Sequence, residues 1–347
     1  MTVNTTPRER MAAFLSGGRV DRVPCVPLIL NHAARVIGVK VREYATDGDV
    51  MGRAHVAAWR RYGQDLITIF TDTAILAEAM GTVLHFPEDD VARFKAPAVA
   101  RPDDAPKLPH VDARRAGRLP VLLKAIRHCV DEVGSEVFVS CCYSAPFSTA
   151  AALRGTAVFA RDLYKNRDMA HVLLQKSLEL AQDFAEAVTE AGGIPVLVDP
   201  VASGSVISRQ AFEEYALPYI AKTFERIRSL GAPPILHICG RTSGIIDLMA
   251  QSGAVALSVD QIELREAKAK VGDKVCLMGN VRPAETLLQG SPDAVRAEAR
   301  RCLQDCKDNP RGFILASGCE VPIETPPANL MALLEVARDS ALSGAAS

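Results

Sequence analysis

Three side chains that could bind a soft metal ion stand near the ends of two short apolar runs. The segment Leu236–Gly240 reads LHICG, so His237 and Cys239 are two positions apart. In an extended strand, residues i and i+2 point to the same side, so these two side chains project together. Cys319 follows a second apolar run. One imidazole and two thiolates suit Zn²⁺, and three protein ligands leave a fourth position for exchange. The sequence therefore predicts a zinc site.

A carboxylate could complete the zinc shell. The apolar run Val255–Val259 is followed directly by Asp260, which would place an oxygen ligand at the same end of the fold as the two cysteines. An oxygen ligand that substrate can displace suits a catalytic zinc ion. Glu263 stands a turn later and competes for this role, and we expect Asp260 to take it.

Several other polar residues also follow apolar runs. In a barrel of alternating strands and helices, such positions often line the pocket, although each could also cap the following helix. The candidates for substrate binding are Asn31, Asp72, Tyr143, Asp199 and Asn280.

Two more patterns argue against other chemistries. Cys302 and Cys306 are four residues apart beside Arg300, Arg301 and Lys307, which indicates an ordinary, partly buried helix face and not a metal clamp. The chain contains no Gly-x-Ser-x-Gly motif, so a hydrolase triad has no support.

Eight short apolar runs must position these residues. They alternate with longer stretches of helical periodicity, which is typical of a parallel sheet covered by helices on both faces. A count of eight favours an α/β fold of the (β/α)₈ TIM-barrel type, in which chemistry occurs at the carboxyl ends of the strands. No Gly-x-Gly-x-x-Gly follows any run, which argues against a dinucleotide-binding sheet. The runs are Val23–Leu30, Leu66–Phe70, Val137–Cys142, Pro195–Val198, Ile235–Cys239, Val255–Val259, Val275–Met278 and Phe313–Ala316.

The predicted barrel carries two additions within a single domain of residues 1–347. The first is an N-terminal helix, for which Thr6, Pro7 and Glu9 predict a capping box. The second is an elaborated loop from Asp72 to about Pro120, after the second strand and on the active-site face. The longer predicted helices are Asp168–Ala191, Arg209–Leu230, Thr242–Gln251, Pro292–Asp308 and Pro327–Leu342.

Composition excludes several classes of protein. The 347 residues are 48% hydrophobic and 23% charged, which excludes a disordered chain. A formal net charge of −1 and 5% aromatic residues argue against nucleic-acid binding. No apolar run reaches the roughly 18 residues of a membrane span, and the N-terminus lacks the features of an export signal. With 9 cysteines, this predicts a cytoplasmic protein with reduced thiols and no membrane association.

Taken as a set, these motifs resemble the uroporphyrinogen decarboxylase superfamily, and most closely its zinc-dependent corrinoid methyltransferase branch. That branch includes methylcobamide:coenzyme M methyltransferases and the methyltransferases of corrinoid-dependent O-demethylase systems. The resemblance spans nearly the whole chain. It rests on Thr6–Pro24, Tyr143–Gly155 (YSAPFSTAAALRG), Asp199–Phe212 (DPVASGSVISRQAF), Pro234–Gly240 (PILHICG), Gly279–Val281 (GNV), Gly312–Pro322 (GFILASGCEVP) and Thr325–Asn329 (TPPAN).

The resemblance implies that His237, Cys239 and Cys319 bind zinc, with Asp260 at the position of the family's acidic ligand. It further implies methyl transfer between a small molecule and a corrinoid that a partner protein carries, because no corrinoid-binding module is visible in the chain. The small molecule is either a thiol acceptor or a methoxylated donor.

Two alternatives to this function remain. The first is a metal-free decarboxylase of tetrapyrrole carboxylates, although the Arg-rich N-terminal motif of those enzymes is replaced here by Leu28–Arg35 (LILNHAAR). The second is a non-catalytic corrinoid- or tetrapyrrole-binding protein with a structural zinc ion.

Overall fold

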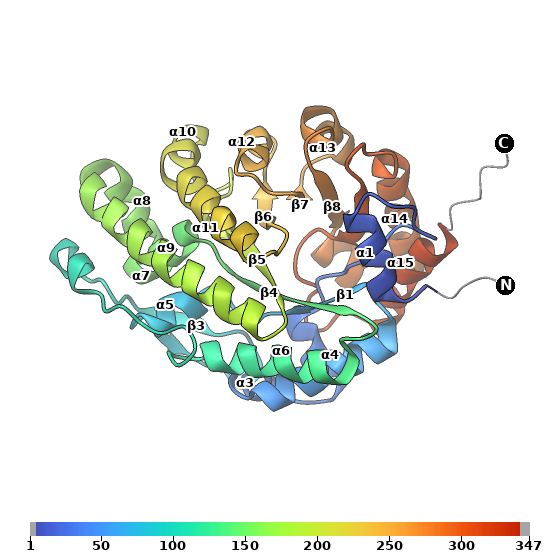
Figure 1. The fold of residues 1–347 in the computed structure, drawn as a ribbon, viewed down its shortest axis with the longest axis horizontal. Helices are drawn as coiled ribbons and strands as arrows, with labels where there is room; N and C mark the ends of the chain where they lie inside the picture. Colours follow the sequence, from blue (N-terminus) through green and yellow to red (C-terminus); the bar gives the residue numbers. More distant parts are fainter. Residues whose placement is uncertain (1–4, 341–347) are drawn as a thin grey trace.

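Seven parallel strands form one curled sheet in the computed structural model, which describes residues 5–340. Their spatial order is the order of the chain, so each strand pairs with the next, as in a TIM barrel. Helices cover the outside of the curve (Figure 1). The fold class is therefore confirmed. The strands are β1 (Leu66–Ile69), β4 (Phe138–Ser144), β5 (Ile194–Val198), β6 (Ile235–Arg241), β7 (Ala256–Gln261), β8 (Cys276–Val281) and β9 (Phe313–Ser317).

The first predicted strand, Val23–Leu30, is not a regular strand. It makes one isolated parallel bridge, between Cys25 and Leu315 of β9. Pro24 and Pro27 lack the N–H groups that a continuous ladder would need. The segment therefore takes the place of the eighth strand without forming a ladder, which corrects the sequence prediction.

Asp65, which directly precedes β1, ties this irregular segment to the sheet. Its N–H donates to the Cys25 carbonyl oxygen (2.9 Å), and its carboxylate accepts from the Cys25 N–H (2.7 Å). The same buried carboxylate accepts from the guanidinium groups of Arg22 (2.7 Å) and Arg10 (2.8 Å). Polar contacts thus replace the missing ladder at the seam between β9 and β1.

The helices agree with the sequence prediction in most of their positions. The predicted helix Arg209–Leu230 is divided by a π-helical turn, η4 (Phe212–Ala216). Pro218 lies in the first turn beyond it and cannot donate a backbone hydrogen bond, which accounts for the interruption. The α-helices are α1 (Pro7–Leu15), α2 (Ala33–Val36), α3 (Val41–Thr46), α4 (Gly48–Tyr62), α5 (Ile75–Ala79), α6 (Leu119–Val133), α7 (Pro146–Arg154), α8 (Thr156–Lys165), α9 (Arg167–Glu190), α10 (Arg209–Ala211), α11 (Leu217–Ser229), α12 (Ile246–Gln251), α13 (Leu264–Val271), α14 (Pro292–Cys306) and α15 (Pro327–Asp339). Leu342, the predicted end of the last helix, lies outside the described residues.

Both predicted additions to the barrel are present. Helix α1 begins with the expected capping box, in which the Thr6 hydroxyl accepts from the Glu9 N–H and the Glu9 carboxylate accepts from the Thr6 N–H. The Arg8 N–H donates to the carbonyl oxygen of Glu136 just before β4 (2.8 Å), so α1 lies at the amino ends of the strands. The elaborated loop follows the carboxyl end of β1 and contains an antiparallel hairpin, β2 (Val83–His85) and β3 (Arg93–Ala96).

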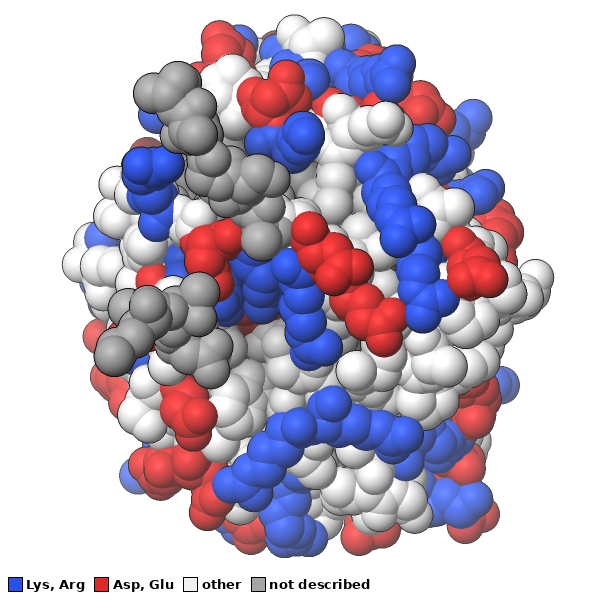
Figure 2. Space-filling view, turned by 90° about the vertical axis from the view of Figure 1, so that its right-hand side faces the viewer, with Lys and Arg blue, Asp and Glu red and all other residues white. Residues whose placement is uncertain are grey.

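The side chains of the sheet divide into an outer and an inner set. On β6, Leu236 and Ile238 pack outward against the helices, whereas His237 and Cys239 point into the barrel. The inner set is mostly aliphatic and surrounds a cavity. On the outer surface, acidic and basic side chains are interspersed on the face shown in Figure 2. Across residues 5–340, no helix is both long enough and apolar enough to cross a membrane.

Candidate metal centre and cavity

The structure brings His237, Cys239 and Cys319 together at the mouth of the barrel. Their donor atoms all lie within 4.8 Å of one another. His237 and Cys239 point inward from β6, and Cys319 follows β9 by two residues. Among residues 5–340, this is the only group of three His, Cys, Asp or Glu side chains with donor atoms arranged to hold one metal ion.

The His237 ring is held in a fixed orientation. Its Nδ1 is hydrogen-bonded to Ser258 Oγ (3.0 Å), and its Nε2 lies 3.6 Å from Cys319 Sγ. Ser258 is the register partner of His237 on β7, so the parallel pairing itself places the hydroxyl beside the ring. A metal-binding histidine commonly gives its second nitrogen to such a partner. Sequence reasoning did not assign Ser258 a role, although its inward position two residues before Asp260 was a usable signal.

The two thiols influence each other's pKa. The Cys319 thiol donates a hydrogen bond to the sulfur of Cys239, and this bond lowers the pKa of Cys239 below its usual value. The same bond, together with burial, raises the pKa of Cys319. Because metal binding requires thiolates, a bound cation would release the protons of both sulfurs.

Asp260 lies beside the donor group but is not one of its members. Its Oδ2 accepts from the Gly240 N–H (2.8 Å), directly after Cys239. Its Oδ1 faces Gly318, where an added Cβ would be only 2.9 Å away. The carboxylate thus packs between the two turns that carry the cysteines. Glu263 is exposed and stands at the start of α13, away from the donor group.

Glu320 lines the cavity next to Cys319 and was missed by sequence reasoning. Its carboxylate accepts from the Asn31 side-chain amide (2.8 Å) and from the Asn31 backbone N–H (3.2 Å). Burial raises the pKa of Glu320 to about 7. Asn31 also donates to the Thr71 carbonyl oxygen (2.8 Å), so it holds Glu320 in place and does not itself line the cavity.

Two further predicted substrate residues are engaged in buried polar contacts. Asp72 accepts from the Arg118 guanidinium (2.7 Å). Asp199 is fully buried, and its Oδ1 accepts from the Ser148 hydroxyl (2.5 Å) and the Ser148 N–H (2.9 Å). Burial raises the pKa of Asp199 to about 7. Both carboxylates stabilise the backbone around the barrel mouth.

The structure places Tyr143 in the core and not at the mouth. Along β4 it is Cys142 that points into the barrel, whereas Tyr143 points outward and packs edge-on against Phe184. Asn280 donates to the carbonyl oxygens of Asp260 (2.8 Å) and Ile262 (2.7 Å) and thereby fixes the chain after β7. None of the five predicted substrate residues lines the cavity.

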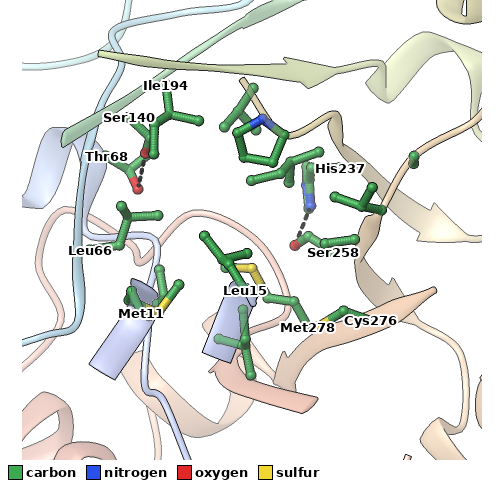
Figure 3. A pocket seen from close by; sticks show the side chains of 18 of the residues that line it. Met11, Leu15, Leu66, Thr68, Ser140, Ile194, His237, Ser258, Cys276 and Met278 are labelled. Carbon is green, nitrogen blue, oxygen red and sulfur yellow. Dashed lines mark hydrogen bonds between the residues drawn. The ribbon is translucent and has the colours of Figure 1, made fainter. Parts of the chain in front are cut away.

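The cavity below the donor group has a volume of about 920 Å³. It extends through the barrel from His237 to Met11 and Leu15 of α1, and its walls are mostly aliphatic (Figure 3). Its few polar side chains include Thr68 and Ser140, whose hydroxyls are hydrogen-bonded to each other (3.0 Å). Small-molecule sites commonly measure about 300–1,000 Å³, so a complete organic ligand fits here.

A sequence model of the uroporphyrinogen decarboxylase (URO-D) family matches residues 6–340. The chain belongs to this family. It is 28% identical over 343 residues to methylcobamide:CoM methyltransferase MtbA of Methanosarcina mazei, covering 96% of this chain and 98% of that protein. A solved structure of a methyltransferase from Methanosarcina mazei superposes with a TM-score of 0.88 at 27% identity, covering 97% of this chain and 99% of that one.

Decarboxylases are also similar to this chain. The uroporphyrinogen decarboxylase of Alcanivorax borkumensis is 26% identical over 356 residues, covering 96% of this chain and 98% of that protein. The resemblance inferred from the motifs, to the family and to its methyltransferase branch, is therefore confirmed. Since the family contains both kinds of enzyme, the function must be argued from the site.

Proposed function

We propose that this chain is a zinc-dependent methyltransferase that moves a methyl group between a small molecule and the corrinoid of a partner protein. The observation that carries the proposal is the group of His237, Cys239 and Cys319 donor atoms, all within 4.8 Å at the mouth of a large cavity. The methyltransferases among the relatives support the type of reaction.

The residues fit a zinc ion in three respects. The donors are one imidazole and two thiols, Ser258 turns the ring of His237 toward the thiols, and the hydrogen bond with Cys319 lowers the pKa of Cys239. When bound, zinc would lower the pKa of a coordinated thiol, or polarise the oxygen of a methyl ether. The aliphatic walls below would exclude water from the methyl group during transfer.

Asp260 is our candidate for a displaceable fourth ligand. Its Oδ2 is held by the Gly240 N–H, and Oδ1 lies between the turns that carry the two cysteines. We expect the side chain to rotate so that one carboxylate oxygen reaches the ion when the site is filled. The exposed position of Glu263 gives it less support for this role.

The five predicted substrate residues receive different roles under this proposal. We assign Asn31 the positioning of Glu320, which lines the cavity. Asp72, Asp199 and Asn280 hold the backbone around the mouth, and Tyr143 is a core residue.

The decarboxylase alternative has weaker support from this structure. Arg35, the arginine in the region where decarboxylases carry their Arg-rich motif, is ion-paired with Asp89 (2.8 Å) and Glu324 (2.6 Å). It is therefore not free to bind the carboxylates of a tetrapyrrole. A metal-free decarboxylation would also leave the clustered His237, Cys239 and Cys319 without a role.

The test is methyl exchange with the purified, zinc-loaded protein in a reducing buffer. Methylcob(III)alamin and cob(I)alamin are offered with a panel of thiols and methoxyarenes, and uroporphyrinogen is offered in parallel. We expect methyl transfer with a corrinoid and no dependence on nicotinamide or flavin. Decarboxylation of uroporphyrinogen at an enzymatic rate, unaffected by chelators, would overturn the proposal. We expect the protein to act in the cytoplasm.

A further inference from the structure

The charged residues around the cavity limit what kind of small molecule can reach the donor group. Two cations line the cavity, Lys274 and Arg311. Lys274 precedes β8 and Arg311 precedes β9, so both stand at the amino ends of the strands, and both are exposed. The donor group lies at the opposite, carboxyl end of the barrel. Within residues 5–340, no lysine or arginine lines the part of the cavity next to that group.

Two arginines near the mouth are bound to carboxylates. Arg118 donates to Asp72 (2.7 Å) and Glu78 (2.8 Å). Arg282 donates to Glu298 (3.0 Å). Neither arginine lines the cavity. An anionic ligand would also have to compete with two carboxylates for the buried guanidinium of Arg118.

The groups that do face the donor group are neutral or acidic. Glu320 lines the cavity directly after Cys319, and Asp260 lies against the turn after Cys239. Arg241, at the end of β6, is exposed and does not line the cavity. With zinc bound, the two thiolates would balance the two positive charges of the ion. An anionic group on the ligand would then face the carboxyl groups of Glu320 and Asp260 and no further cation.

The walls below the donor group would also disfavour a charged ligand. Val196, Val198, Met278 and Ile314 face the cavity, and each is at least nine-tenths buried. Moving an ionised group from water into such surroundings is costly unless it is paired. An apolar group, in contrast, gains free energy from the same burial.

We propose that the methyl donor or acceptor is a neutral, mostly apolar molecule, with its thiol or methoxy group at the donor group and its apolar body inside the barrel. This inference rests on the proposed function and specifies its substrate class. It separates the chain from a coenzyme M methyltransferase such as its relative MtbA, because coenzyme M carries a sulfonate beside its thiol.

The test compares neutral and anionic probes of matched shape. Benzyl mercaptan and its para-carboxylate, anisole and para-methoxybenzoate, and mercaptoethanol and mercaptoethanesulfonate are titrated into the zinc-loaded protein by calorimetry. We expect each neutral aromatic probe to bind at least tenfold more tightly than its carboxylate. Equal or tighter binding of the anionic probes, mercaptoethanesulfonate included, would overturn the inference.

Substitutions inside the barrel locate the binding. Ala256 lines the cavity two residues before Ser258, and Ala256→Phe should reduce benzyl mercaptan affinity at least tenfold while leaving the zinc content unchanged. The matched control is Ala269→Phe on the exposed side of α13, which should bind as the wild type does. If Ala256→Phe does not fold, Ala256→Leu provides the smaller change. Unaltered affinity in a folded Ala256 variant would place the ligand elsewhere and contradict the inference.

The binding data and the methyl-exchange assay can fail independently. If anionic probes bind and exchange methyl groups with the corrinoid, the inference is wrong and the proposed function stands. If neutral probes bind in the barrel but no probe exchanges methyl groups, the proposed function is wrong, and with it the assignment of these ligands as methyl donors or acceptors.

Discussion

At the scale of single residues, the donor group depends on neighbours that do not touch the metal position. The Ser258 hydroxyl takes one nitrogen of His237, so the other nitrogen must face the thiols. The Gly240 N–H and Asp260 hold the turn after Cys239. These contacts arrange the three donors before any ligand binds.

The first prediction concerns the zinc content. Cys239→Ala and Cys319→Ala should each lose most of the bound zinc, because removing one thiolate from a small ligand shell severely weakens binding. Elemental analysis of the purified variants measures this. Cys302→Ala and Cys306→Ala are the controls: their thiols face Asn280 and the Leu264 carbonyl oxygen, and their zinc content should equal that of the wild type. Full zinc retention in both donor variants would exclude the site.

The second prediction separates the two tasks of Asp260. Asp260→Ala should retain most of its zinc, because three donors remain, but should lose more activity than metal. Asp260→Asn can still accept from the Gly240 N–H but is a poorer zinc ligand. If Asp260 is the displaceable ligand, both variants lose activity; if it only supports the turn, Asp260→Asn keeps wild-type kinetics. X-ray absorption of the resting wild type should show two sulfur and two lighter ligands.

The third prediction concerns pH and Asp199. Burial raises the pKa of Asp199 from 3.8 to about 7, so between these pH values the folded state holds a proton that the unfolded state has released. The stability contributed by this group is therefore present at low pH and is lost as the pH rises toward 7. Asp199→Asn cannot lose a proton and still accepts from Ser148. The melting temperature of Asp199→Asn minus that of the wild type should be larger at pH 8 than at pH 5 by at least about 2 °C. The same difference at both pH values would contradict the assignment.

At the scale of elements, the barrel closes through polar contacts where a strand is interrupted by prolines. The Asp65 carboxylate is fully buried between Arg10 and Arg22. Removing a charge from such a cluster leaves the other charges buried without a partner.

The fourth prediction follows from that cluster. Asp65→Asn should lower the free energy of unfolding by about 3 kcal/mol, as measured by urea denaturation. The matched control is Asp21→Asn. Asp21 is ion-paired with the same Arg10, but the Asp21 side chain is 41% exposed. This substitution should cost less than about 1 kcal/mol. Equal effects of the two substitutions would show that burial of Asp65 is not what makes the cluster important.

The same elements show what the sequence could and could not predict. Apolar runs located all seven strands of the curled sheet, because buried parallel strands need continuous hydrophobic sequence. The prolines at positions 24 and 27 were visible, yet the apolar residues around them still suggested a strand. The π-helical turn before Pro218 depends on how the helix accommodates the backbone N–H that this proline lacks. The spacing of apolar residues along the sequence does not reveal this.

Side-chain direction explains both the success and the omissions at the site. His237 and Cys239 were found because their i, i+2 spacing itself shows that they share a face. For Tyr143 the predicted strand ended at Cys142, whereas β4 continues to Ser144. The prediction therefore placed at the mouth a residue that lies within the strand and points outward. Glu320 was missed because its role depends on Asn31, which is distant in sequence and close only in the folded chain.

At the scale of the whole molecule, the donor group connects only β6 and the turn after β9, at one end of the barrel. Other contacts hold the barrel together. The core lies between the sheet and its surrounding helices, and the seam between β9 and β1 is closed by Asp65. Neither depends on a metal ion. This arrangement is what we expect around a catalytic zinc ion, because a structural zinc ion usually has four closed ligands and stabilises folding directly.

The last prediction uses this difference. Removing zinc with a chelator should abolish methyl transfer, while the circular dichroism spectrum stays that of the folded protein and the melting temperature falls only by a few degrees. Readdition of zinc should restore activity, because the barrel keeps His237, Cys239 and Cys319 close together. A non-catalytic protein with structural zinc would instead unfold on chelation, and a metal-free decarboxylase would keep its activity. The zinc-free protein thus separates all three functions in one preparation, by measuring its spectrum, its melting temperature and its turnover with methylcob(III)alamin and with uroporphyrinogen.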